Sequence, residues 1–206
     1  MNKCKIYVEG IADRKFIADF VSFHYNISLI KGSLIENKQN ENLIETGGKD
    51  NIGKIITELQ RNTFQKIKNV LIFDADNDYN KRKRELQDFK KKNKVDFDFF
   101  LFPDNKVVGD LEDLLINIIN LNNQKIFDCW DSYETCLRSI SSKMTLPAKK
   151  TKVYAYLEPL LGETKSQKEK IKEANRDYTN AKHWDLNNEY LKPLKDFLDK
   201  YFNVIS

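Results

Sequence analysis

Acidic residues stand at or just beyond the ends of three apolar runs in this sequence. The set comprises Glu9, Asp13, Asp74, Asp76, Asp110 and Glu112. If the runs are parallel strands, their carboxyl ends meet at one edge of a sheet, where ligands of such sheets bind. Carboxylates that share an edge repel one another unless a cation or a proton neutralises them. Oxygen ligands without histidine or cysteine favour Mg²⁺ or Mn²⁺, with Ca²⁺ as a third candidate.

Some of these residues also have a purely structural explanation. Asp13 and Asp110 could each cap the helix that follows. Glu9 is harder to explain in this way, because a carboxylate at the buried end of a strand is costly without a partner. Asp74 and Asp76 are two residues apart, so in a strand their side chains point the same way. We therefore expect function most strongly at Glu9, Asp74 and Asp76.

The first half of the chain alternates between strand-like and helix-like segments. Strands are expected at 4–10, 69–76 and 95–105, with one or two short strands within 27–46. Helices are expected at 13–25, 47–67, 81–93 and 109–121. The run "NVLIF" is almost wholly apolar, as in strands covered on both faces. This order predicts an α/β protein with an open, mostly parallel sheet and helices on both faces.

The second half has few strand signals. Helical spacing is found in 124–142 and 187–202, 153–162 reads as helical up to Pro159, and 166–178 reads as an exposed helix or loop. We expect a Rossmann-like α/β core over 1–121 and a helical extension over 122–206 that packs on it.

Composition indicates a charge-rich globular protein. Of 206 residues, 40% are hydrophobic and 32% are charged, and the net charge of +4 permits a polyanionic partner. Cys4, Cys129 and Cys136 form no CxxC pair, which favours reduced thiols and a cytoplasmic location. A strand-like run begins at once after Met1, so no signal peptide is expected, and no apolar stretch suits a membrane span.

Two other motifs compete for the aspartates of "FDADNDYNKRKRE". A calcium-binding EF-hand loop would use Asp74, Asp76, Asp78 and Glu85, but Tyr79 stands in place of the turn glycine. A strand also precedes the motif instead of a helix. A haloacid-dehalogenase-like phosphatase uses Asp-x-Asp on its first core strand, whereas this motif lies on a later one and would leave the acidic residue of "YVEG" unexplained.

The segments "YVEGIADRKFI", "GGKDNI", "LIFDADND" and "FPDNKVVGDLEDLL" together resemble the Toprim domain. This module is shared by topoisomerases, bacterial primases, nucleases that mature ribosomal RNA and OLD-family (overcoming lysogenization defect) nucleases. The sequences of these motifs are most similar to those of small stand-alone Toprim proteins of bacteria and archaea. The resemblance covers roughly residues 3–121, and "CWDSYETCL" and "HWDLNNEYLKPLKDFL" extend it over nearly the whole chain.

The resemblance implies Mg²⁺- or Mn²⁺-dependent chemistry on phosphodiesters. Glu9, Asp74 and Asp76 match the usual catalytic metal positions. In OLD-like nucleases an acidic residue four after the glutamate helps to build a second metal site, and Asp13 matches it. Glu112, with Asp110 behind it, is our choice for the other ligand. Two metals together can activate water and stabilise the leaving oxygen.

Basic residues near the acidic motifs would contact nucleic acid, DNA or RNA. We assign this role to Lys49, Lys81, Arg82, Lys83, Arg84 and Lys149. OLD-like nucleases also use a downstream lysine for transition-state charge. The sequence offers Lys149, Lys150 and Lys152 without ranking them, and we take Lys150 as the candidate.

The sequence predicts a Toprim-type nuclease and leaves two other readings open. It has no tyrosine gate, zinc module or Walker A motif, which argues against a topoisomerase, a primase and an ATPase in the same chain. One alternative is a non-catalytic module that binds metal and nucleic acid or docks on a separate ATPase. The other is a small phosphatase or phosphotransferase. A homodimer is compatible with the sequence.

Overall fold

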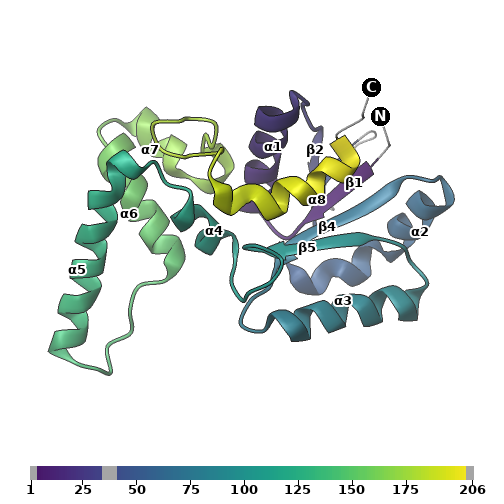
Figure 1. The fold of residues 1–206 in the computed structure, drawn as a ribbon, viewed down its shortest axis with the longest axis horizontal. Coiled ribbons are helices and arrows are strands. Elements are labelled where there is room, and N and C mark those ends of the chain that lie inside the picture. Colours follow the sequence, from purple (N-terminus) through teal and green to yellow (C-terminus); the bar gives the residue numbers. More distant parts are fainter. Residues whose placement is uncertain (1–3, 34–40, 203–206) are drawn as a thin grey trace.

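A computed structural model describes residues 4–33 and 41–202, which form one parallel sheet with helices on both faces (Figure 1). Its strands are β1 (Cys4–Val8), β2 (Lys31–Ser33), β3 (Leu43–Glu45), β4 (Lys68–Asp74) and β5 (Asp98–Phe102). They lie in the order β2-β3-β1-β4-β5, and every pairing is parallel. The expected open α/β sheet is confirmed, and within the described residues it is wholly parallel.

Each face of the sheet is covered by its own helices. Helices α1 (Ile11–Tyr25) and α8 (Lys192–Phe202) pack on one face, and α2 (Ile56–Phe64) and α3 (Tyr79–Asn93) on the other. Strand β4 shows why its run is so apolar, since Val70 and Ile72 enter one hydrophobic cluster while Leu71 and Phe73 enter the other. The two helix layers thus cover both faces of β4, and only its first residue, Lys68, and its last residue, Asp74, reach solvent.

The chain after β5 is helical. It contains α4 (Leu111–Asn117), α5 (Gln124–Ile140), α6 (Lys149–Leu161) and α7 (Lys165–Ile171). The 3-10 segments of this part are η2 (Leu121–Asn123), η3 (Glu173–Asn175) and η4 (Glu189–Leu191). Another 3-10 segment, η1 (Lys49–Ile55), lies earlier in the chain, directly before α2. The extension shares the larger core with the sheet, because Phe127, Tyr156 and Leu198 belong to the same buried cluster as Ile6. The far end of α5 projects from the body (Figure 1).

Helices α4 and α6 differ in length from the expectation, and the segments 47–67 and 166–178 each divide into a 3-10 segment and a shorter helix. Helix α4 ends at Asn117 because Ile118 and Ile119 pair with the segment around Trp184 instead; the amide of Asp185 donates to Ile118 O at 2.7 Å. Helix α6 continues through Pro159 to Leu161. Proline removes one hydrogen bond there, which the last turn of a packed helix can tolerate.

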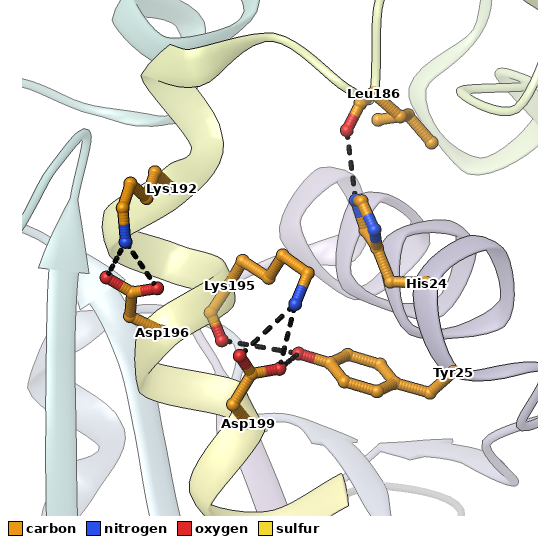
Figure 2. A network of polar contacts seen from close by, with 7 residues as sticks. All are labelled: His24, Tyr25, Leu186, Lys192, Lys195, Asp196 and Asp199. Atoms are coloured by element: carbon orange, nitrogen blue, oxygen red, sulfur yellow. Dashed lines mark hydrogen bonds and ion pairs between the residues drawn. The ribbon is translucent and has the colours of Figure 1, made fainter. Parts of the chain in front are cut away.

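A polar network joins the C-terminal helix to α1 (Figure 2). The Tyr25 hydroxyl donates to Asp199 at 2.7 Å, and Asp199 also pairs with Lys195 at 3.1 Å. The His24 Nε2 atom lies 2.9 Å from Leu186 O. These contacts fix α8 across the sheet.

Among the described helices, none has the length and apolarity that a membrane crossing requires.

Candidate functional site at the carboxyl edge of the sheet

The acidic residues gather where the parallel strands end. Asp74 lies opposite Phe102, so β4 and β5 end level, and Val8 lies opposite Ile72, so β1 ends two residues before β4 does. Glu9 follows β1 directly, and helix α4, which follows β5, begins beside the end of β4. Three separate segments therefore deliver carboxylates to one edge.

Glu9 is held between a backbone amide and a buried arginine. Its Oε1 atom accepts from Arg82 Nη2 at 3.1 Å and from the Asp74 amide at 3.3 Å. Burial raises the pKa of Glu9, Arg82 opposes that rise, and the charge of Asp76 adds to it. Arg82 is only 8% exposed and lies over the Phe73 ring. It was expected on an open helix surface, and the structure instead makes it an internal partner of Glu9.

Asp13 lies in the first turn of α1 and is 7% exposed. Its Oδ2 atom accepts from the Gly10 amide at 2.7 Å, so it helps to cap the helix, although Gly10 is the N-cap residue itself. Burial raises the pKa of Asp13 to about 7; the Gly10 amide opposes the rise, and Glu9 and Glu112 contribute to it. Asp13 therefore takes part in capping α1, and it also lies among the acidic side chains of this edge.

Asp74, the last residue of β4, has the most perturbed carboxyl of the edge. Its Oδ1 atom accepts from the Leu111 amide at 3.1 Å, which ties β4 to the start of α4. Burial raises its pKa to about 9, and the charges of Asp13, Glu9 and Asp110 add to the rise. At neutral pH Asp74 therefore keeps a proton unless a cation replaces it.

Asp76 lies outside the strand, contrary to the period-two argument. Strand β4 ends at Asp74, and Asp76 adopts a left-handed conformation with φ of 55°. Its amide and carbonyl pair with Gly109 at 2.9 and 2.8 Å. Gly109 has φ of 141°, and a Cβ there would come within 2.4 Å of the Asp113 side chain. The glycine thus allows the two acidic loops to approach each other.

The N-terminus of α4 forms a compact acidic cap. Asp110 is the N-cap and exchanges hydrogen bonds of 3.0 and 3.1 Å with Asp113. Lys149, at the start of α6, bridges Asp113 at 2.5 Å and Asp110 at 3.2 Å. Burial raises the pKa of Asp110, which the Asp113 amide opposes. Glu112 is half-buried, and burial raises its pKa as well. Asp113 was missed in the sequence, although its spacing from Asp110 is that of a capping box.

The expected basic residues lie in different places. Lys81 and Arg84 are exposed on α3, and Lys83 is half-buried with its amine over the Tyr79 ring. Lys150 pairs with Glu173 at 2.5 Å. Among the described lysines of this set, Lys149 contacts the acidic edge, through Asp110 and Asp113. The side chain of Lys49 lies outside the described part of the structure.

As placed, the carboxylates are close but not assembled as a cage. In the described ranges, no three histidine, cysteine, aspartate or glutamate side chains are positioned to hold a metal ion. Their present partners explain this, because Glu9 faces Arg82, Asp13 faces Gly10 and Asp110 faces Lys149. The donor chemistry still suits a hard divalent cation, because the carboxyl groups here have raised pKa values and too little positive charge lies near them. A cation would have to draw some of these side chains from their partners.

The fold and this edge define a class of protein: an α/β chain with a Rossmann-like parallel sheet whose carboxyl edge carries crowded carboxylates. The chain belongs to the family described as "Protein of unknown function (DUF3226)", whose model matches residues 3–203. Searches of curated proteins and of solved structures found no match.

Proposed function

We propose that the protein is a Toprim-type nuclease that hydrolyses nucleic-acid phosphodiester bonds with Mg²⁺ or Mn²⁺. The observation that carries the proposal is the crowding at the carboxyl edge, where burial and neighbouring charges raise the pKa of Asp74 to about 9 and that of Asp13 to about 7. A protein keeps such a costly arrangement most often at a functional site. The order of Glu9, Asp74 and Asp76 also resembles that of Toprim nucleases.

Glu9, Asp74 and Asp76 would hold the cation, and Asp13 with Glu112 would hold a second one. A bound divalent cation supplies a Lewis acid that lowers the pKa of water and offsets charge on phosphate oxygens. Arg82 holds Glu9 in place at the edge. Lys149, which spans Asp110 and Asp113, can turn toward a phosphate because its side chain is 49% exposed.

Basic side chains on the surface beside this edge support the proposal that the substrate is a polyanion. Helix α3 begins beside the edge and exposes Lys81 and Arg84. Contacts of this kind are independent of base sequence and weaken as salt rises. A nucleic acid would then be bound mainly through its backbone, with the scissile phosphate over the carboxylates.

The test is incubation of the purified chain with single- and double-stranded DNA and with RNA, in Mg²⁺, in Mn²⁺ and in chelator. We expect metal-dependent cleavage by the wild type and its loss in Glu9→Gln, which keeps the shape of the side chain and a hydrogen bond to Arg82. Glu163→Gln, an exposed glutamate far along the chain, is the matched control. Equal cleavage by wild type and Glu9→Gln, which indicates a contaminant, or no cleavage of any substrate, would rule out the proposal.

A further inference from the structure

Arg176 brings a buried positive charge to the same neighbourhood from the far end of the chain. It follows η3, which packs against α1, and its side chain is only 1% exposed. Its Nε atom donates to Ile171 O at 2.9 Å, and the guanidinium lies 4.7 Å from the centroid of the Tyr154 ring. The backbone contact and the ring hold the side chain in one position.

The outer end of this guanidinium has no hydrogen-bond partner. Within the described residues, no acceptor lies within hydrogen-bond geometry of Nη1 or Nη2 of Arg176. The nearby hydroxyl of Tyr178, on whose pKa the Arg176 side chain acts against the effect of burial, also lacks a partner by that geometry. Tyr178 is 0% exposed, and its ring packs against Phe16 of α1 at 5.3 Å. Buried donors are normally satisfied, and a buried charge without acceptors is costly. These three donors together indicate a partner that the chain itself does not supply.

The surroundings place these donors beside the acidic edge. The positive charge of Arg176 opposes the rise in the pKa of Glu112. Burial raises the pKa of Tyr178, and the negative charges of Asp13 and Glu112 add to that rise. Glu173, three residues before Arg176, pairs with Lys150 at 2.5 Å. The donors therefore border the part of the site formed by Asp13 and Glu112.

We propose that the Arg176 guanidinium, with the Tyr178 hydroxyl beside it, is a phosphate-binding site at this edge. The two Nη atoms form a planar fork that matches two oxygens of a phosphate, and the ring contact already fixes its orientation. Because the fork is covered here, phosphate entry requires neighbouring side chains to shift. That the phosphate belongs to a nucleic acid rests on the proposed nuclease function.

Inorganic phosphate is the probe, and thermal unfolding of the full chain in metal-free buffer is the readout. Phosphate at about twenty times its dissociation constant should raise the Tm of the wild type by roughly 5 °C. Sodium chloride of equal ionic strength corrects for general salt effects. Arg176→Met keeps the apolar stem of the side chain and removes the guanidinium, together with its contact with the Tyr154 ring. Tyr178→Phe keeps the packing of the ring, and Arg138→Met makes the same chemical change as Arg176→Met at an exposed position on α5.

We expect Arg176→Met to lose most of the phosphate shift, Tyr178→Phe to lose part of it, and Arg138→Met to keep all of it. Without phosphate, Arg176→Met should still unfold in one cooperative transition, so that its response to phosphate can be compared with that of the wild type whatever its starting Tm. Equal phosphate shifts in wild type and both site variants, or no shift beyond that of chloride, would overturn the proposal.

The two proposals fail in different ways. If Glu9→Gln has no effect on cleavage while the phosphate shift still depends on Arg176, the nuclease assignment fails and the phosphate site stands. If the wild type cleaves in a Glu9-dependent manner but Arg176→Met binds phosphate normally, only the phosphate site fails.

Discussion

The crowded edge predicts that replacing the ionisable carboxyl group of Asp74 by an amide stabilises the metal-free protein. At pH 7 the carboxyl keeps a proton in the folded state, with a pKa of about 9, and loses it on unfolding, where the pKa is 3.8. The difference between pH 7 and 3.8 corresponds to about 4 kcal/mol at most, because one pKa unit is about 1.4 kcal/mol. Partial solvent access and the burial of the amide reduce this, so we expect Asp74→Asn to raise the free energy of unfolding by about 2 kcal/mol.

The sign of the effect gives it a characteristic pH dependence. Between pH 3.8 and about 9 the folded Asp74 binds more protons than the unfolded one, so its contribution to stability falls as pH rises. The advantage of Asp74→Asn should therefore be small at low pH. It should grow by up to about 1.4 kcal/mol for each pH unit toward the alkaline end of this window. The asparagine carbonyl can still accept from the Leu111 amide, so the local structure is kept.

The assay is urea unfolding in chelator at several pH values, followed by circular dichroism. Asp88→Asn, an exposed change on α3, is the control and should leave stability unchanged. Added Mg²⁺ should stabilise the wild type more than Asp74→Asn, because a ligand stabilises only the state that binds it. If Asp74→Asn is less stable than the wild type at alkaline pH in chelator, the carboxylates do not destabilise the metal-free fold and the reasoning is wrong.

Three further predictions concern an ion pair of the edge and two contacts of the C-terminal helical extension. Arg82→Met should destabilise the protein by about 3 kcal/mol, because it leaves Glu9 buried without its ion pair; urea unfolding should show that adding Glu9→Gln recovers much of the loss. Leu198→Ala should cost about 3 kcal/mol, since Leu198 is 0% exposed in the shared core, and the protein should still unfold in a single calorimetric transition. Burial lowers the pKa of His24 below 6.5, so its contribution to stability is complete above pH 6.5 and is lost as pH falls below it; His24→Gln should reduce this acid sensitivity in thermal unfolding.

The sheet and its acidic edge could be read from sequence because each depends on local pattern. The run of β4 is apolar on both faces, which identifies a central parallel strand, and Asp74 marks its end. Strand ends in a parallel sheet share one edge, so Glu9 and Asp110 follow without knowledge of the packing. The position of Asp76 was less accessible, because its left-handed backbone is set by pairing with Gly109 in a distant loop.

The positions of the basic side chains at the edge could be predicted from the sequence only in part. Arg82 lies four residues before the buried Leu86, so the helical period already placed it on the inward face of α3. Its basic neighbours in sequence suggested a surface instead. Arg176 has no comparable local signal. It follows a short 3-10 segment, and only the packing of that segment against α1 brings it to the site.

The charge balance of the edge therefore depends on both halves of the chain. The carboxylates come from the segments after β1, β4 and β5, and among the described cations placed against them Arg82 belongs to the first half. Lys149 comes from α6 and Arg176 from the segment after η3. A core that ended near residue 121 would keep the repulsion between Asp13, Asp74 and their neighbours and lose two of the positive charges placed against it. The helical extension is thus an electrostatic part of the candidate site, in addition to the cover that it gives the core.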